Sequence, residues 1–158
     1  TRGIVSDSKN NLYIGTYEGL YTQENGHKKA KEVIVKGEKN GVYDILFLEK
    51  NDSILWATEG YNWIKRVNLN THTKKEFEQT DGLAIQCLKE KSSDAFWLGT
   101  DQGLFVFDKK TGKTSPYVED GYFLGNTSVF GFTEARNGKK WIATRQGLFV
   151  KEKGKDVL

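Results

Sequence analysis

The chain has 158 residues, of which 37% are apolar and 13% aromatic, a composition that suits a folded domain with its own hydrophobic core and argues against intrinsic disorder. Its 24 basic residues are nearly balanced by 21 acidic ones, and the net charge of +3 is spread along the sequence rather than gathered on one arm, so we expect no nucleic-acid partner. No apolar run approaches the roughly 20 residues that cross a bilayer, so we expect no membrane contact within this segment.

A short phrase that ends in threonine occurs four times along the chain. The copies are Tyr13-Ile14-Gly15-Thr16, Leu55-Trp56-Ala57-Thr58, Trp97-Leu98-Gly99-Thr100 and Trp141-Ile142-Ala143-Thr144, with threonines 42, 42 and 44 residues apart. A fixed period of this size is typical of a repeat protein whose units bury their faces on one another. The period divides the chain into four repeats, at about residues 1–38, 39–80, 81–120 and 121–158.

Each repeat contains short apolar runs separated by polar turns, a pattern that predicts antiparallel strands. The first run precedes the threonine phrase, at residues 3–5, 42–46, 85–88 and 129–132. The phrase itself is the second strand, and a glycine turn leads to a third at residues 19–21, 103–107 and 147–150. A weaker fourth run lies at residues 32–35, 75–78 and 115–118. The last of these holds the only proline, which suits an outer edge.

Four strands in about 42 residues, repeated without helical periodicity, predict an all-β fold of four-stranded β-propeller blades. Four blades lie at the lower limit for a closed propeller, so we expect a segment of a larger ring. An unclosed arc would expose the flanks of its first and last blades and favour self-association. The tryptophans of the repeated phrase are expected to lie buried between blades.

The third repeat carries the phrase most fully, from the acidic turn at Asp94 through Trp97-Leu98-Gly99-Thr100-Asp101-Gln102-Gly103-Leu104 to an aromatic third strand. These residues resemble the two-component regulator propeller repeat, whose pattern contains W-[IL]-G-T-x-x-G-L. The last repeat fits nearly as well, and the first has Tyr13 in place of the tryptophan. The second departs from the pattern at residues 57–64, which lengthen the turn and add two aromatics.

The resemblance implies a function and a location. In that family, such repeats form the extracytoplasmic sensor region of membrane-spanning hybrid histidine kinases, commonly as propellers of about seven blades, and many members sense oligosaccharides. The chain is therefore expected to be a periplasmic sensor segment that binds an oligosaccharide or other small ligand, with no cofactor, no metal and no catalysis of its own. Its further partners would be the remaining blades or a second copy of the chain, and kinase activity would reside in other modules.

The loops that follow the second strand, and the linkers between blades, emerge on one face of a propeller. We predict ligand contacts from residues of this face, namely Tyr17, Glu59, Tyr61, Asn62, Trp63, Asp101, Tyr122, Phe123, Asn126 and Arg145. Aromatic rings beside an amide, as at residues 61–63, can stack on a sugar ring and hydrogen-bond its hydroxyls. The same loops could instead cover the core or contact a neighbouring blade.

The sequence offers little for catalysis. His27 and His72 fall in polar turns without metal-ligand spacing, and Cys87, the only cysteine, is expected to be a small buried hydrophobe. Asp44 is the one carboxylate among residues expected to line the central channel. Two alternatives stay open: a scaffold that binds a protein on the same face, and a propeller lyase or hydrolase, for which Asp44 would be the first residue to mutate.

Overall fold

A computed structural model describes residues 2–38, 41–60, 62–79, 82–119, 122–123, 125–152 and 155–157. The strands form four antiparallel four-stranded sheets and one two-stranded ribbon. These described ranges contain no helix, and therefore none that is long and apolar enough to cross a membrane. The chain divides into two compact units, Thr1–Gly82 and Leu83–Leu158.

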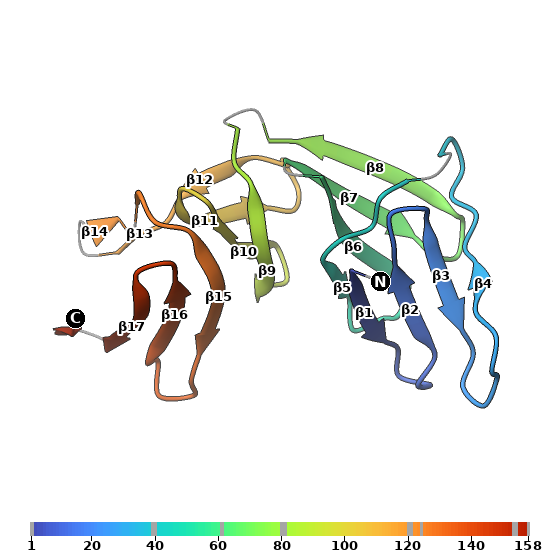
Figure 1. Ribbon diagram of the computed structural model, residues 1–158, viewed down its shortest axis with the longest axis horizontal. Coiled ribbons are helices and arrows are strands. Elements are labelled where there is room, and N and C mark those ends of the chain that lie inside the picture. The colour runs from blue at the N-terminus through green and yellow to red at the C-terminus, as the bar shows by residue number, and fades with distance from the viewer. Residues whose placement is uncertain are drawn as a thin grey trace. The chain divides into compact units, whose positions relative to one another are not determined.

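The first unit contains two sheets in which the strands follow chain order (Figure 1). The first sheet comprises β1 (Gly3–Ser6), β2 (Leu12–Gly15), β3 (Leu20–Gln23) and β4 (Lys31–Glu32). The second comprises β5 (Leu46–Leu48), β6 (Ile54–Glu59), β7 (Trp63–Asn68) and β8 (Thr73–Glu78). Strands β1 and β5 are in contact. The two sheets bury a core of Leu20, Val35, Tyr43, Leu46, Leu55, Ala57 and Val67.

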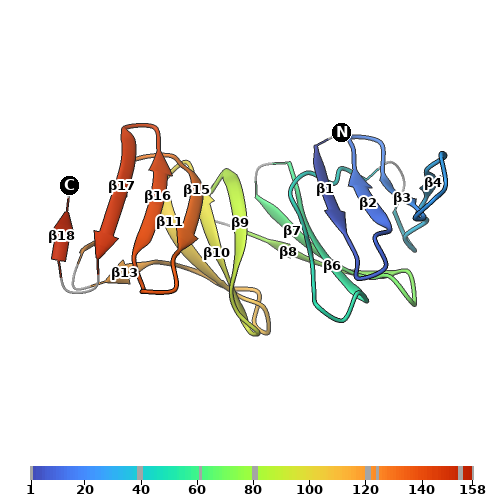
Figure 2. The ribbon, with the colours of Figure 1, turned by 90° about the horizontal axis from the view of Figure 1, so that it is seen from below.

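The second unit repeats this arrangement (Figure 2). Its first sheet comprises β9 (Ile85–Ser92), β10 (Ala95–Thr100), β11 (Gly103–Asp108) and β12 (Thr114–Pro116). A ribbon of β13 (Val118–Glu119) and β14 (Tyr122–Phe123) precedes the second sheet, which comprises β15 (Val129–Glu134), β16 (Lys140–Thr144), β17 (Gly147–Glu152) and β18 (Lys155–Val157). Strand β15 contacts both β9 and β10. The core between the sheets contains Trp97, Leu104, Val129, Phe132 and Ile142.

The glycine of the repeated phrase lets one sheet approach the next closely. A Cβ atom added at Gly15 would lie 2.4 Å from the carbonyl oxygen of Tyr43, and one added at Gly99 would lie 2.5 Å from that of Val129. Real Cβ atoms essentially never approach other atoms this closely, so the segment before β5 and the start of β15 can lie against these glycines only because the side chain is absent.

These sheets confirm the prediction of four-stranded propeller blades. Trp56 and Trp97 are buried, at 1% and 5% exposed, as predicted, and Trp97 belongs to the core between the two sheets of its unit. Trp141 is only half-buried, which differs from the prediction. Pro116 lies in β12, which pairs only with β11 and so forms an outer edge, as predicted. Cys87 is half-buried rather than fully buried.

One predicted strand is wrong at its start. The first strand of the second repeat was expected from residue 42, but β5 begins at Leu46. The backbone N–H of Tyr43 donates to the carbonyl of Thr16 in the first sheet, and that of Asp44 donates to Thr58 in the second. This segment therefore crosses between two sheets instead of belonging to one.

The strand register also corrects the alignment of the second repeat. Trp56 pairs with Arg66, which is two residues before Asn68. In the third repeat, Trp97 pairs in the same way with Val106, which is two residues before Asp108. Asn68 and Asp108 are equivalent, because each side-chain oxygen accepts the backbone N–H groups two and three residues later. Trp56 therefore takes the place of Trp97, and the threonine alignment is shifted by one residue in this repeat.

Candidate functional site

The predicted ligand-binding residues are divided equally between the two units. Tyr61 lies outside the described residues, and only the backbone of Tyr122 and Phe123 is described, as strand β14. The others are Tyr17, Glu59, Asn62 and Trp63 in the first unit, and Asp101, Asn126 and Arg145 in the second.

In the first unit, Tyr17 lies beside an ion pair formed by Arg2 and Asp44. The guanidinium carbon of Arg2 is 4.9 Å from the centroid of the Tyr17 ring, and Tyr17 is 61% exposed. Arg2 donates two hydrogen bonds to the Asp44 carboxylate, of 2.5 Å from Nε to Oδ1 and 2.7 Å from Nη2 to Oδ2. An exposed aromatic ring next to a guanidinium can stack on a sugar ring and donate to its hydroxyls.

The other predicted residues of this unit are engaged within their own sheet. The side-chain amide of Asn62 donates to the carbonyl of Gln79 at 3.3 Å, and its backbone carbonyl accepts the Gln79 N–H at 2.8 Å. Trp63 begins β7, is half-buried, and pairs with Glu59. Two hydrogen bonds thus link Asn62 in the β6–β7 hairpin loop to Gln79, which directly follows β8.

In the second unit, Asp101 and Arg145 form hydrogen bonds that connect hairpin turns to the linkers before each sheet. The Asp101 carboxylate accepts the N–H of Ala84 at 2.8 Å, and the Asp101 N–H donates to the Ala84 carbonyl at 3.0 Å. The backbone N–H of Arg145 donates to the carbonyl of Ser128, while the residue is exposed. Asn126 is exposed and has a φ of 59°, in the left-handed region that asparagine tolerates better than most residues.

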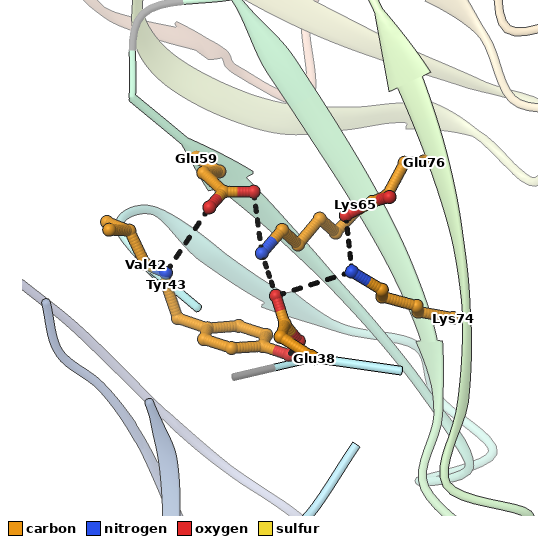
Figure 3. A network of polar contacts seen from close by, with 7 residues as sticks. All are labelled: Glu38, Val42, Tyr43, Glu59, Lys65, Lys74 and Glu76. Carbon is orange, nitrogen blue, oxygen red and sulfur yellow. Dashed lines mark hydrogen bonds and ion pairs between the residues drawn. The ribbon is translucent and has the colours of Figure 1, made fainter. Parts of the chain in front are cut away.

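Sequence reasoning missed a charged network in the first unit, centred on Lys65 of β7 (Figure 3). The side chain of Lys65 is fully buried, which is rare for lysine unless it is paired. The register places Lys65 opposite Ala57, in the row where the other repeats have an aromatic residue, namely Tyr21, Phe105 and Phe149. A cation thus replaces an aromatic ring at one junction between sheets.

Two carboxylates compensate the buried ammonium group. Lys65 Nζ donates to Oε1 of Glu38, which lies in the connection between β4 and β5, and it lies 2.6 Å from Oε2 of Glu59. The hydroxyl of Tyr43 donates to the other oxygen of Glu38, and the centroid of its ring lies 4.8 Å from Lys65 Nζ. The network joins the connection between the two sheets to the buried face of the second sheet (Figure 3).

Glu59 occupies the place that threonine has in the other repeats. Thr100, for example, donates from its hydroxyl to the Gly103 carbonyl at 2.9 Å and accepts the Gln102 N–H at 3.1 Å, which closes the hairpin. Glu59 instead accepts the N–H of Val42 at 3.4 Å and binds the buried lysine. The second repeat therefore departs from the pattern at two positions, with Glu59 in place of threonine and Lys65 in place of an aromatic residue. These two residues form an ion pair with each other.

The environment fixes the protonation of the network. Burial acts to raise the pKa of Glu38, but the hydrogen bonds from Lys65 and Tyr43 outweigh it and hold that pKa below its ordinary value. Burial, together with the hydrogen bond to Glu38, raises the pKa of Tyr43 far above its ordinary value. At neutral pH, Glu38 is therefore ionised and Tyr43 protonated, so donors and acceptors keep fixed roles.

Carboxylates that lie close together can also bind a metal ion. Oxygens of Glu38, Glu59 and Glu76 lie within 4.8 Å of one another. Lys65 binds the first two, and Lys74 lies 2.7 Å from Glu76 and 3.7 Å from Glu38. The two ammonium groups already supply the positive charge that these carboxylates need, which makes the cluster an ion-pair network.

Two pockets in the first unit differ in size and place. One of about 30 Å³ lies beside Glu38 and Tyr43, and has room for a water molecule but not for a sugar ring. The other, of about 200 Å³, is lined by residues of the β3–β4 turn: Thr22, Glu24, His27, Lys28, Lys29 and Lys31. This turn is at the opposite end of the strands from Tyr17.

Comparisons with known proteins support the fold. No family model matches the chain, and a search of the curated proteins finds no match. Among solved structures, the chain resembles the extracellular domains of proteins described as the hybrid two component systems BT4673 and BT3049 from B. thetaiotaomicron. Identities are 17% and 19% and TM-scores 0.70 and 0.69, covering 98% and 93% of this chain but only 22% and 20% of those chains.

A streptogramin B lyase is also similar, at 16% identity and a TM-score of 0.66, with 98% of this chain and 55% of that chain covered. All three likenesses concern the fold, and the chain spans about a fifth of the length of the first two structures.

Proposed function

We propose that this chain is a ligand-sensing segment of an extracytoplasmic β-propeller, in a protein that belongs to a two-component regulatory system. The main support is that extracellular domains of two hybrid systems match nearly the whole chain in fold. The repeated phrase points to the same family of propellers. In this proposal the segment performs no reaction, the periplasm is its location, and kinase modules belong to other parts of the parent protein.

The ligand we propose is an oligosaccharide bound on the surface around Tyr17 and Arg2. Tyr17 offers an exposed ring, and the guanidinium of Arg2 lies over that ring while it donates two hydrogen bonds to Asp44. A fixed donor beside an exposed aromatic ring reduces the side-chain entropy that binding would otherwise cost. Hydroxyl-rich ligands fit this combination, since the ring supplies area and the guanidinium supplies directed hydrogen bonds.

The alternative of a propeller lyase has one similar structure in its favour. Its best acid or base here would be Asp44, whose carboxylate is held by two hydrogen bonds from Arg2 and whose side chain is 16% exposed. A general acid or base needs to exchange a proton with a substrate, and an ion-paired carboxylate is poorly suited to that task. We therefore favour binding over catalysis.

Calorimetric titration with a panel of plant and host oligosaccharides tests the proposal. Saturable heat is expected with at least one of them, and Tyr17→Ala should raise its Kd by about 2- to 13-fold, the equivalent of about 0.5–1.5 kcal/mol of aromatic stacking. Lys28→Ala, in the pocket at the opposite end of the strands, is the matched control and should leave Kd unchanged.

Absence of binding to every oligosaccharide would contradict the proposed ligand. A loss of affinity in Lys28→Ala but not in Tyr17→Ala would move the site to the β3–β4 turn and contradict the proposed surface.

A further inference from the structure

Three asparagines of this chain directly precede a glycine, namely Asn25, Asn40 and Asn137. Such a pair favours the loss of ammonia from the asparagine, because glycine has no side chain to hinder the attack of its backbone nitrogen on the neighbouring amide carbon. Asn40 lies outside the described residues. Asn25 and Asn137 both lie in turns and are both exposed, so exposure does not distinguish them.

The backbone nitrogen of the glycine is the nucleophile of this reaction, and its surroundings differ between the two turns. Gly26 lies in the β3–β4 turn with a φ of 81°, and its N–H has no hydrogen-bond partner among the described residues. In the β15–β16 turn, the N–H of Gly138 donates to the carbonyl of Ala135 at 2.9 Å. Within the described part of the chain, the nucleophile is thus available in the first turn and engaged in the second.

The side chains of the two asparagines differ in the same sense. Nδ2 of Asn25 donates one long hydrogen bond, of 3.2 Å, to the carbonyl of the exposed Lys9. Oδ1 of Asn137 accepts the N–H of Lys139 at 3.1 Å, inside a turn that is closed by a hydrogen bond of 2.8 Å from the Ala135 N–H to the Lys139 carbonyl. Opening this turn costs more hydrogen bonds than reorienting the amide of Asn25.

We propose that Asn25 is a deamidation site of the folded chain, whereas the fold protects Asn137. The Gly26 nitrogen loses its proton to hydroxide and forms a bond to Cγ of Asn25. The Cγ–Nδ2 bond breaks, and Nδ2 takes a proton from water and leaves as ammonia, which restores the hydroxide. Water then opens the succinimide ring, at Cγ to give aspartate or at the main-chain carbonyl carbon to give isoaspartate. This inference does not depend on the proposed function.

The modification changes the contact between two neighbouring turns. The backbone N–H of Asn25 donates to Oδ1 of Asn11 at 2.9 Å, and its side chain donates to Lys9, so Asn25 joins the β3–β4 turn to the β1–β2 turn. A carboxylate has no hydrogen to donate to the Lys9 carbonyl, and isoaspartate also inserts a methylene group into the backbone. The β3–β4 turn therefore loses a hydrogen bond and gains a negative charge.

Peptide mapping by mass spectrometry, during incubation at mildly alkaline pH, tests the proposal. Cleavage after glutamate releases residues 25–32 and 135–152, each with a single asparagine. The deamidation rate of each peptide is measured in the folded chain and in concentrated urea, and the ratio of the two rates gives the protection that the fold provides. Protection of Asn137 should exceed that of Asn25 by about fivefold or more, the factor that one hydrogen bond of about 1 kcal/mol represents.

Asn25→Gln is the matched variant, because the longer side chain keeps the amide but would have to close a larger ring. It should abolish ammonia loss in residues 25–32 and leave the rate in residues 135–152 unchanged. Thermal unfolding followed by tryptophan fluorescence checks that the variant is folded. In the wild type, fragmentation that distinguishes the two products should find both isoaspartate and aspartate at residue 25, as a ring intermediate requires.

Equal protection of the two asparagines, or greater protection of Asn25, would overturn the proposal. Failure of Asn25 to deamidate in the folded chain, while it does so in urea, would also overturn it. Formation of aspartate alone would exclude the proposed route, because direct hydrolysis of the side-chain amide does not use the Gly26 nitrogen.

Discussion

Replacing Lys65 by alanine is expected to destabilise the first unit by about 3–5 kcal/mol, the usual cost of removing one partner of a buried ion pair. The Lys65 side chain is 0% exposed and that of Glu38 is 8% exposed. After the replacement, the ammonium group of Lys74 still lies 3.7 Å from the Glu38 carboxylate. The lost side chain also leaves a cavity in the core.

Lys31→Ala is the matched control, since it removes a lysine of the same unit from an ion pair at the surface. Lys31 Nζ lies 3.2 Å from Glu24, and the two side chains are 71% and 51% exposed. Water replaces such a partner, so the change should be less than about 1 kcal/mol. The comparison separates the effect of burial from that of charge.

Urea unfolding measures both changes, with tryptophan fluorescence and circular dichroism followed on the same samples. Coincident transitions check that the unfolding is two-state, and the slope checks that the exposed surface is unchanged. The double variant Lys65→Met/Glu38→Gln should be more stable than Lys65→Ala, because it leaves neither member of the pair charged. A loss in Lys65→Ala no larger than that in Lys31→Ala would refute the view that the buried pair stabilises this unit.

Two further predictions concern acid and packing. The folded-state pKa of Glu38 lies below its ordinary value of 4.5. The ionised Glu38 therefore contributes fully to the free energy of unfolding above pH 4.5, and this contribution is lost as the pH falls through the lowered pKa. The urea midpoint of the wild type should fall on acidification, and that of Glu38→Gln should fall less. Gly99→Ala should cost about 1–3 kcal/mol in thermal unfolding, because its Cβ would meet the Val129 carbonyl oxygen at 2.5 Å, whereas Gly131→Ala, with its nearest neighbour at 3.8 Å, should change stability by less than about 1 kcal/mol. An unchanged midpoint in acid, or equal costs at the two glycines, would contradict these arguments.

The strand pattern was predictable from the sequence because its determinants are local. Turn glycines such as Gly103, whose φ is 124°, and side-chain caps such as Asp108 act within a few residues. The turn glycine recurs as Gly19, Gly103 and Gly147 in three of the four repeats, so the period shows it directly. The burial of Trp56 and Trp97 follows from the same periodicity.

The register of the second repeat was not predictable from residue types alone. Leu55-Trp56-Ala57-Thr58 matches the repeated phrase by composition, and only the turn at Asn68 shows that Glu59 holds the threonine place. The lengthened hairpin removes the fixed spacing that makes the other repeats easy to align. Counting back from the capped turn, instead of forward from the glycine, is the signal that would have found it.

The candidate sites depend on contacts between sheets, which sequence spacing does not give. Lys65 and Glu38 are 27 residues apart, and Arg2 and Asp44 are 42 apart. In each pair the acidic residue lies in the connection between the first and second sheets. Tyr17 was predicted as a surface residue of a loop, but its partner Arg2 lies before the first strand and carries no motif. Such pairs become visible only when the packing of the sheets is known.

The outermost strands of the sheets have a consequence for solubility. Strand β4 has two residues and β12 has three, including Pro116, which lacks an N–H group to donate. Strand β8 is longer, but two lysines and two glutamates make up four of its six residues, and Phe77 is its only apolar residue. Edge strands that are short, charged or contain proline are poor templates for the addition of a strand from another molecule. Fibril growth by lateral hydrogen bonding is thereby disfavoured at these edge strands.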